Sequence, residues 1–250
     1  MQSRIAPFIL TIGVLMNFAG STSLETFQGD EEYLRFDYSG AETLYLNQLS
    51  IDLSKSGAYW RLSRLFISIA DVSPAKDREG FYRTAERYAR KCIMTNVENA
   101  DGHTWLAASL GNIAMYEGGE TKVQLSREIH RELLRALELN PNDDVAYSIL
   151  GSFYRALGGI SWIERQLANL LLGGVPDGGY PEAETALKKA ITLAPQVMRH
   201  QYEIGMLYRD WDRIDEAKEV LRKAASLSPS VKSDSTRIQE IQRFFEEEDQ

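Results

Sequence analysis

This sequence of 250 residues contains few cysteines and histidines and carries no net positive charge. The single cysteine, Cys92, excludes an intramolecular disulfide and a cysteine-based metal cluster, and three histidines are too few for a histidine-rich metal site. Acidic residues outnumber lysine and arginine by 36 to 28, which gives a formal net charge of −8. Nucleic-acid backbones select basic patches instead. We therefore predict no metal, no cofactor and no nucleic-acid partner.

Long apolar runs are also missing, apart from one near the N-terminus. Residues 5–18, IAPFILTIGVLMNF, form an apolar run of 14 residues that follows Arg4 and precedes small residues. This is the pattern of a secretory signal peptide, and the run is shorter than the roughly 20 residues that span a bilayer. We expect a signal peptide over 1–21, cleavage after Ser21 or Ser23, and export to a bacterial periplasm. The alternative is an uncleaved segment that anchors the chain to a membrane.

Alternating strand patterns are absent, and what is present is a helical repeat. Pro195 and Pro229 each end a helical run and lie 34 positions apart (229 − 195), which is the length of a tetratricopeptide unit of two antiparallel helices. Gly205 is expected where the two helices of the last unit cross closely, and Tyr208 is expected to fill the space between hairpins. The pattern predicts an all-α, tetratricopeptide-like α-solenoid of antiparallel helical hairpins, which is stabilised by stacking.

The same marks recur upstream with a break in the period. Pro141 lies 54 positions before Pro195 (195 − 141), which is one period of 34 plus 20 residues. The extra residues fall between the two helices of the penultimate hairpin, where insertions are tolerated. Weaker marks further upstream give about four hairpins in all, with flanking helices. We divide the mature chain into degenerate N-terminal hairpins (24–100), a repeat domain (101–229, with the insertion at 158–181) and a C-terminal capping helix with an acidic tail (230–250).

The insertion, GGISWIERQLANLLLGGVPDGGYP, is apolar in its first half and rich in glycine in its second. A helix is expected from an N-cap at Ser161 to Gly173, because apolar residues recur there at helical spacing. GGVPDGG lacks the lysine of a phosphate-binding loop and is interpreted as a turn. Two interpretations of the helix are open. It packs on the neighbouring unit and enlarges the core, or it forms a wall or lid of an apolar pocket that includes Trp162 and Leu170, with Arg165 at the rim.

Four stretches resemble the tetratricopeptide domain of the regulator of microtubule dynamics family. They are HTWLA at 103–107, RALELNPND at 135–143, YSILGSFYRALGGISWIER at 147–165 and EAETALKKAITLAP at 182–195. The resemblance implies a non-enzymatic protein. Members of that family are linked to microtubule association and membrane contact sites, and one member's domain is described as binding and transferring phospholipid. An exported chain would meet no tubulin, so we expect only the binding of a partner protein or an amphipathic ligand to carry over.

The first helices of tetratricopeptide hairpins line a concave groove, so their groove-facing side chains form the candidate site. Arg155 and Arg209 each follow the repeat tyrosine of their unit, and together they could hold a carboxylate or phosphate. The alternative is that each pairs with a neighbouring acid such as Asp210 or Asp212. The lysine and asparagine pattern of carboxylate-clamp chaperone receptors is absent. The candidate partner- or ligand-binding residues are Ser148, Ser152, Arg155, Tyr202, Met206 and Arg209, with Trp162, Arg165 and Leu170 of the insertion.

Catalytic signatures are missing as well. No nucleophile lies at a plausible spacing from a base, and the acids are spread around the helices rather than clustered. We therefore expect no catalytic residue and no enzyme. The sequence predicts a non-catalytic scaffold that mediates protein–protein or peptide interaction in an extracytoplasmic compartment. The alternative is a lipid- or amphiphile-binding or transfer protein that uses the groove and the inserted helix, and contact with a membrane is left open.

Overall fold

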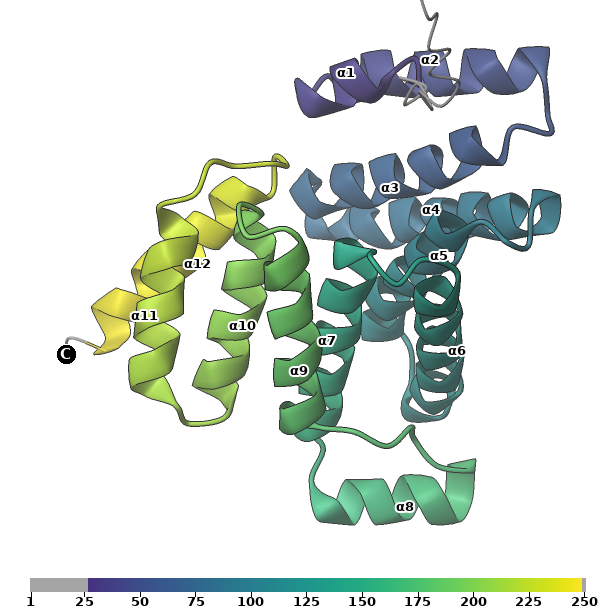
Figure 1. Ribbon diagram of the computed structural model, residues 1–250. Coiled ribbons are helices and arrows are strands. Elements are labelled where there is room, and N and C mark those ends of the chain that lie inside the picture. Colours follow the sequence, from purple (N-terminus) through teal and green to yellow (C-terminus); the bar gives the residue numbers. More distant parts are fainter. Residues whose placement is uncertain (1–26, 249–250) are drawn as a thin grey trace, which may run out of the picture.

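The computed structural model describes residues 27–248, so the expected signal peptide over 1–21 lies outside the described residues. This part of the chain is built from α-helices and one short 3₁₀ turn, without a β-strand (Figure 1). The predicted all-α, tetratricopeptide-like fold is confirmed. None of these helices has both the length and the apolarity needed to cross a membrane. The elements are α1 (Asp30–Leu34), α2 (Tyr38–Ile51), α3 (Ser56–Val72), α4 (Ala75–Thr95), α5 (Ala100–Ile113), η1 (Ala114–Tyr116), α6 (Gly119–Leu139), α7 (Asp144–Gly158), α8 (Trp162–Leu172), α9 (Tyr180–Leu193), α10 (Met198–Asp210), α11 (Ile214–Ala225) and α12 (Asp234–Glu248).

Four consecutive helical hairpins form the body of the molecule, namely α3 with α4, α5 with α6, α7 with α9 and α10 with α11 (Figure 1). In the last two hairpins the two helices approach closely at a glycine. A Cβ atom on Gly205 would lie 2.6 Å from Cγ of Leu221, and one on Gly151 would lie 2.4 Å from Cγ of Leu187. Only glycine leaves room for these crossings. The role expected for Gly205 is therefore confirmed, and α8 lies inside the penultimate hairpin as the break in the period predicted.

The core follows the stack as three adjoining clusters instead of one centre. Fully buried alanines such as Ala89 and Ala190 lie at the helix crossings, and leucines such as Leu133 and Leu187 fill the spaces between them. Each hairpin thus buries its apolar face against its neighbours. The stacking leaves one face of the first helices, α3, α5, α7 and α10, turned towards the inside of the curve.

Polar pairs fix neighbouring hairpins relative to one another. The carboxylate of Asp143 caps the start of α7 and also accepts a hydrogen bond of 2.7 Å from the Thr104 hydroxyl of α5. His103 of α5 and Glu132 of α6 form a buried pair at 2.6 Å. Burial alone would lower the pKa of His103, but its hydrogen bonds to Glu132 and to a backbone carbonyl hold that pKa above the ordinary value. These pairs set the register of α5, α6 and α7.

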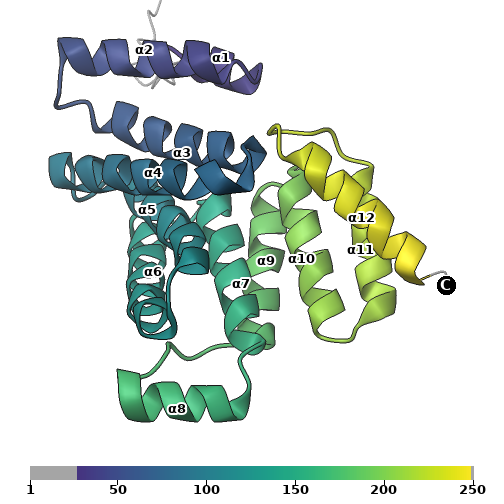
Figure 2. The same ribbon diagram turned by 180° about the vertical axis from the view of Figure 1, so that it is seen from behind.

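The segment before the last helix contacts the N-terminal end of the stack. The backbone N–H of Lys232 donates to the Tyr38 hydroxyl at 3.4 Å, across 194 positions of sequence. Val231 packs against the N-terminal core cluster, and the Lys232 ammonium lies 5.4 Å from the centre of the Tyr38 ring. The segment before α12 accordingly lies beside the end of α3 in both views (Figures 1 and 2). This contact closes the curve of the solenoid around its concave side.

Candidate binding groove

A groove of about 660 Å³ occupies the concave side. Its walls come from the first helices of the four hairpins, α3, α5, α7 and α10, and from α12, with contributions from the starts of α4 and α6. The expectation that first helices line the groove is confirmed. The volume lies within the range of about 300–1,000 Å³ that is usual for sites that bind small ligands or short segments.

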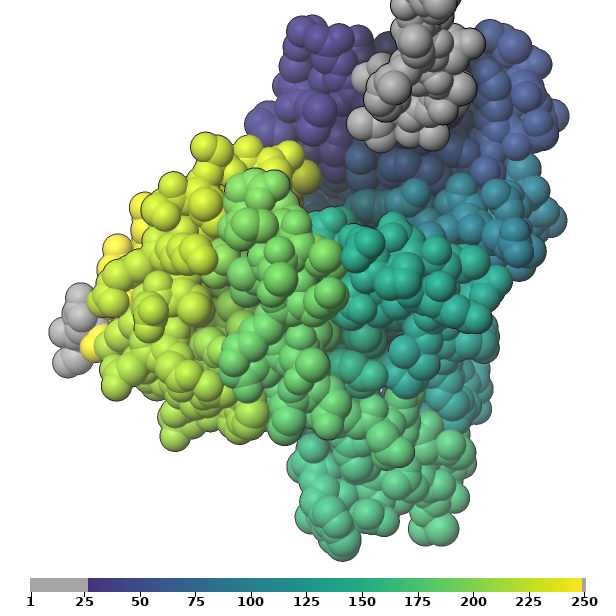
Figure 3. Space-filling view, viewed as in Figure 1, coloured from purple at the N-terminus to yellow at the C-terminus, as the bar shows by residue number. Residues whose placement is uncertain are grey.

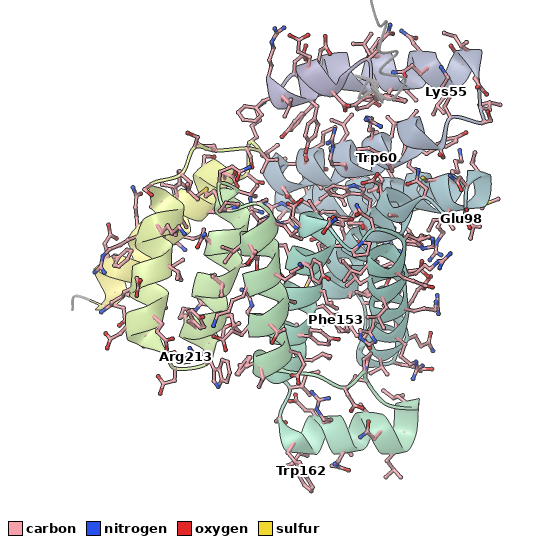
Figure 4. All side chains as sticks on the ribbon, in the orientation of Figure 1. Lys55, Trp60, Glu98, Phe153, Trp162 and Arg213 are labelled. Carbon is pink, nitrogen blue, oxygen red and sulfur yellow. The ribbon has the colours of Figure 1, made fainter. Side chains whose placement is uncertain are left out.

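Apolar side chains form the floor of the groove. Trp105 and Ile67 come from the two N-terminal hairpins, Ile129 from α6, and Ile149 and Phe153 from α7. All but Phe153 are buried in the central core cluster, and Phe153 packs against that cluster. Figure 4 shows Phe153 between α7 and α6, on the inner side of the stack. The floor is therefore a rigid apolar surface rather than a mobile loop.

The charged lining is more basic than the chain as a whole. Five cations line the groove against three acids, although the full sequence carries a net charge of −8. Each acid is already engaged by a neighbour in the groove. Asp71 accepts from the Tyr82 hydroxyl at 2.9 Å, Glu203 accepts from the Ser152 hydroxyl at 2.9 Å and from Arg155 at 3.2 Å, and Glu240 accepts from the Tyr202 hydroxyl.

Arg199 of α10 has no carboxylate of its own. It lines the groove and is half-buried, and within residues 27–248 its guanidinium forms neither a hydrogen bond nor an ion pair. Burial, followed by the charge of Arg237, lowers the pKa of Arg199 from its ordinary value. An arginine side chain nevertheless stays charged in proteins. Glu203 and Asp71 act on the charge of Arg199 without forming an ion pair with it. A partly desolvated charge is more stable when it is paired, so this position favours an anionic group from a ligand.

Lys122 also forms no ion pair within residues 27–248, but it is exposed to solvent. Arg237 and Arg78 differ from Arg199 in their partners. Arg237 donates to Asp234 at 2.8 Å, and its guanidinium lies 5.9 Å from the centre of the Tyr202 ring. Arg78 donates to a backbone carbonyl at 2.8 Å rather than to an acid. An anion that meets Arg199 would therefore have the partly compensated Arg237 next to it. Arg199 and Arg237 come from α10 and α12, which also contribute Glu203 and Glu240 to the lining.

The groove contains three of the side chains that the repeat pattern selected. Ser152, Arg155 and Tyr202 line it. Ser148 does not line it, because it is fully buried between helices. Met206 packs against the C-terminal core cluster. The repeat pattern placed six side chains on one inner wall of the groove. In the structure only Ser152, Arg155 and Tyr202 of these six line the groove.

The two arginines of the repeat pattern meet acids. Arg155 pairs with Glu203 at 3.2 Å and with Asp210 at 3.5 Å. Arg209 pairs with the same Asp210 at 2.8 Å and lies outside the groove lining. Of the two alternatives open from the sequence, the structure has the pairing with neighbouring acids. Asp210 pairs with both guanidinium groups. Arg199 is then the arginine of α10 without an ion pair within residues 27–248, and it is called uncompensated in this sense.

The helix of the insertion has the bounds that the sequence predicted, but it neither enlarges the core nor lines the groove. Ser161 caps α8 in a capping box with Glu164, and Gly173 ends it. No residue of α8 is buried, so it does not enlarge the core. No residue of α8 lines the groove either, because its apolar side chains point outwards. Trp162 and Arg165 instead border a separate shallow hollow beside Tyr180 and Trp211.

Sequence reasoning missed Arg199 and Arg237. A signal for Arg199 was available, because it precedes Tyr202 by one helical turn and so lies on the same face of α10. The groove-facing positions predicted on this helix began at Tyr202 and continued towards its C-terminus, so they did not include Arg199. Arg237 gave no such signal, because the repeat pattern ends before α12 and assigned that helix to capping alone. Arg237 lies in the groove because the segment before α12 contacts the N-terminal end of the stack.

Stacked helical hairpins, with a groove on their first helices, define the class of tetratricopeptide-like α-solenoids. A solved tetratricopeptide repeat (TPR) protein of Thermus thermophilus shares this fold with a TM-score of 0.64 and 19% identity, over 86% of this chain and 95% of that one. The model of the family described as regulator of microtubule dynamics protein 1-3 matches residues 25–248. The chain therefore belongs to this family, and the resemblance seen in the sequence is confirmed.

Individual members of the family are distant relatives. Regulator of microtubule dynamics protein 2 of Bos taurus is 25% identical over 187 residues, which are 74% of this chain and 46% of that protein. Regulator of microtubule dynamics protein 1 of Mus musculus is 27% identical over 180 residues, which are 70% of this chain and 58% of that protein. The chain thus spans about half the length of the relatives that it matches.

Proposed function

We propose that this chain is a non-catalytic scaffold whose groove binds an extended segment of a protein partner that carries an acidic group. The tetratricopeptide-like fold and the family of the chain support the role of an interaction scaffold. The observation that carries the finer proposal is Arg199, a half-buried charged side chain that lines the groove and has no ion pair in the described residues. The acidic group is a side-chain carboxylate or the C-terminal carboxylate of the segment.

The lining suits a peptide segment because it combines an apolar floor with polar and charged groups. Apolar side chains of the segment would cover the floor at Trp105 and Phe153. Its carboxylate would accept hydrogen bonds from Arg199, in the geometry that arginine offers to carboxylates. A hydrogen bond to a charged group contributes about 1.5–3 kcal/mol, which corresponds to about 10–100-fold in affinity.

A second candidate is the binding of a lipid or another amphiphile. The observation that favours it is the same apolar floor beside an uncompensated cation, which suits an apolar tail and an anionic headgroup. Native mass spectrometry of the purified chain, followed by solvent extraction, distinguishes the two. A stoichiometric adduct of lipid mass supports the carrier, and a bare mass supports the scaffold.

We also propose that the chain is exported, as the pattern over 1–21 indicates. The family is named for microtubule dynamics, and export would exclude that role because tubulin would be absent from the compartment. Intact-mass measurement of the chain recovered from its native compartment tests the proposal. A mature N-terminus after Ser21 or Ser23 is expected, and an intact residue 1 would favour the membrane anchor instead.

The groove proposal is tested by selection from a displayed peptide library. Wild-type protein is expected to enrich peptides with an acidic residue, or a free C-terminus, at one fixed position relative to apolar residues. Arg199→Gln is expected to lose this preference, whereas Arg209→Gln outside the groove is expected to retain it. Enrichment of basic peptides, or the same acidic preference in Arg199→Gln, would contradict the proposal.

A further inference from the structure

Helix α8 turns an apolar face to the solvent. Five large apolar side chains on this helix are exposed, from 51% for Leu167 to 80% for Leu170. They fall on one side of the helix, while Arg165, Ala168 and Leu172 point to the body at a spacing of three and four residues. We call this side the α8 outer face, and it consists of Trp162, Ile163, Leu167, Leu170 and Leu171.

Hydrogen bonds from two arginines fix the ends of α8. Arg165 donates to the carbonyls of Leu157 at 2.9 Å and Gly178 at 3.2 Å. Arg127 of α6 donates to the carbonyls of Leu172 at 2.8 Å and Gly174 at 3.1 Å. These arginines fix both ends of the helix through its inner side. The α8 outer face is therefore presented in a defined orientation and remains free for contact with something else.

The placement of α8 makes it the first element to meet a flat surface. It lies across the end of the stack, apart from the hairpins, in both views (Figures 1 and 2). The space-filling view shows it as a protrusion at that end (Figure 3). Trp162 points away from the body (Figure 4). A plane can touch the α8 outer face without meeting another helix.

The size of the face argues against a second copy of the chain as the occupant. A helix of 11 residues is about 16 Å long and about 10 Å across, so its outer half presents on the order of 250 Å². Two such faces would bury roughly 500 Å², less than half of the about 1,200 Å² that stable protein interfaces need.

The chemistry of the face argues against a specific protein partner. Specific interfaces combine apolar contacts with directional hydrogen bonds. The nearest charges of α8 are already engaged, since Glu164 accepts from Ser161 and Arg165 binds backbone carbonyls. What remains is apolar area with a tryptophan at one end. This composition suits the boundary between lipid headgroups and acyl chains, where tryptophan is enriched.

We infer that the α8 outer face docks the chain on the surface of a lipid bilayer, with the helix axis in the membrane plane. This inference goes beyond the proposed groove function and does not depend on it. Because the face carries no uncompensated cation, docking uses apolar insertion rather than attraction to anionic lipids. Zwitterionic phosphatidylcholine vesicles are therefore sufficient, and binding to them is insensitive to salt.

Tryptophan quenching by vesicles of phosphatidylcholine with brominated acyl chains tests this inference on the full chain. Residues 1–26 contain no tryptophan, so quenching reports the helical body even if the N-terminal segment also inserts. Wild-type fluorescence is expected to fall on addition of vesicles, at 50 mM and at 500 mM salt alike. Trp162→Phe is expected to lose most of the quenching, and Leu170→Asp is expected to bind vesicles at least tenfold more weakly through this face.

The matched control is Met94→Asp, which places the same charge on an 85% exposed apolar side chain away from α8. It is expected to be quenched as wild type is. Ile163→Ser provides a second variant of the α8 outer face, and circular dichroism checks that each variant is folded. Three results would overturn the inference: an unquenched wild type, a Leu170→Asp variant quenched like wild type, or a dimer in sedimentation velocity that Leu170→Asp dissolves.

Discussion

Two arginines in one groove show how single partners decide what a residue does. Arg155 has Glu203 and Asp210 within 3.5 Å, so its charge is neutralised by acids of the protein itself. Arg199, on the neighbouring first helix, has no such acid in the described residues. The difference follows from Glu203, which lies one turn after Arg199 on α10 but pairs with Arg155 of α7. Residue type alone therefore did not reveal which of them faces a ligand.

Glycine at a helix crossing gives the first prediction. Gly205→Ala would place a methyl group 2.5 Å from a Leu221 methyl carbon, so the crossing must widen. We expect a loss of about 1–3 kcal/mol in the free energy of unfolding, as for other overpacked cores. Gly80→Ala is the control, because a Cβ there meets nothing within 4 Å, and helix propensity predicts a gain of about 0.5–1 kcal/mol. Denaturant titration of both variants measures the difference, and equal effects would contradict the account.

A buried acid gives a prediction for pH. Burial, followed by the nearby Asp143, raises the pKa of Asp101 to about 6, although Arg61 and Arg64 oppose the shift. The native state thus holds this proton more tightly than the unfolded chain, where the pKa is about 3.9. Ionisation of Asp101 therefore destabilises the fold progressively as pH rises from about 4 to above 6.

Asp101→Asn removes this ionisation. The variant is expected to gain up to about 3 kcal/mol relative to wild type at pH 8. Near pH 4 both side chains are largely uncharged, so most of the gain should disappear. Thermal or urea unfolding of both proteins across this pH range gives the comparison. A gain that stays the same at pH 4 and pH 8 would show that the Asp101 carboxylate is not its source.

At the scale of elements, the inserted helix marks where sequence reasoning succeeded and where it stopped. The cap at Ser161, the stop at Gly173 and the apolar stripe were all readable, because capping and helical period are local. The sequence did not show whether this apolar face of α8 points to the body or to the solvent. The helical period shows which residues share a face, but not which face packs against the body. That choice depends on Arg127, which binds the end of α8 from another helix, 45 positions away.

The clamp on α8 is itself testable. Arg127→Ala removes the hydrogen bonds to the carbonyls of Leu172 and Gly174. We expect faster hydrogen exchange in the last turn of α8 and in residues 173–179, with the free energy of unfolding changed by less than about 1 kcal/mol. Arg131→Ala, one turn further along α6, is the control and should leave exchange in α8 unchanged. Unaltered exchange in Arg127→Ala would mean that other contacts hold the helix.

At the scale of the molecule, the number of hairpins and the concave site were predictable from the period of 34, because each hairpin repeats the same packing. The closure of the curve was not. It joins Tyr38 to Lys232 across 194 positions, outside the repeat at both ends. This contact brings α12 and Arg237 into the groove, and for that reason the sequence analysis did not include Arg237 in the site.

Breaking the closure should open the groove. Val231→Asp places a charge against the N-terminal core cluster, where it has no compensating partner and is costly to bury. We expect a larger radius of gyration in small-angle X-ray scattering and faster hydrogen exchange in α12. Val97→Asp introduces the same change at a side chain that is already exposed, and should leave both quantities as in wild type. An unchanged radius in Val231→Asp would show that the curve does not depend on this contact.

The central claim is that the uncompensated Arg199 makes the groove a site for an acidic segment. Calorimetric titration of a selected acidic peptide tests this claim most directly, with wild type, Arg199→Gln and the control Arg209→Gln measured under one salt condition. The account predicts affinity about 10–100-fold weaker for Arg199→Gln and unchanged for Arg209→Gln. Equal affinity of Arg199→Gln and wild type would contradict it.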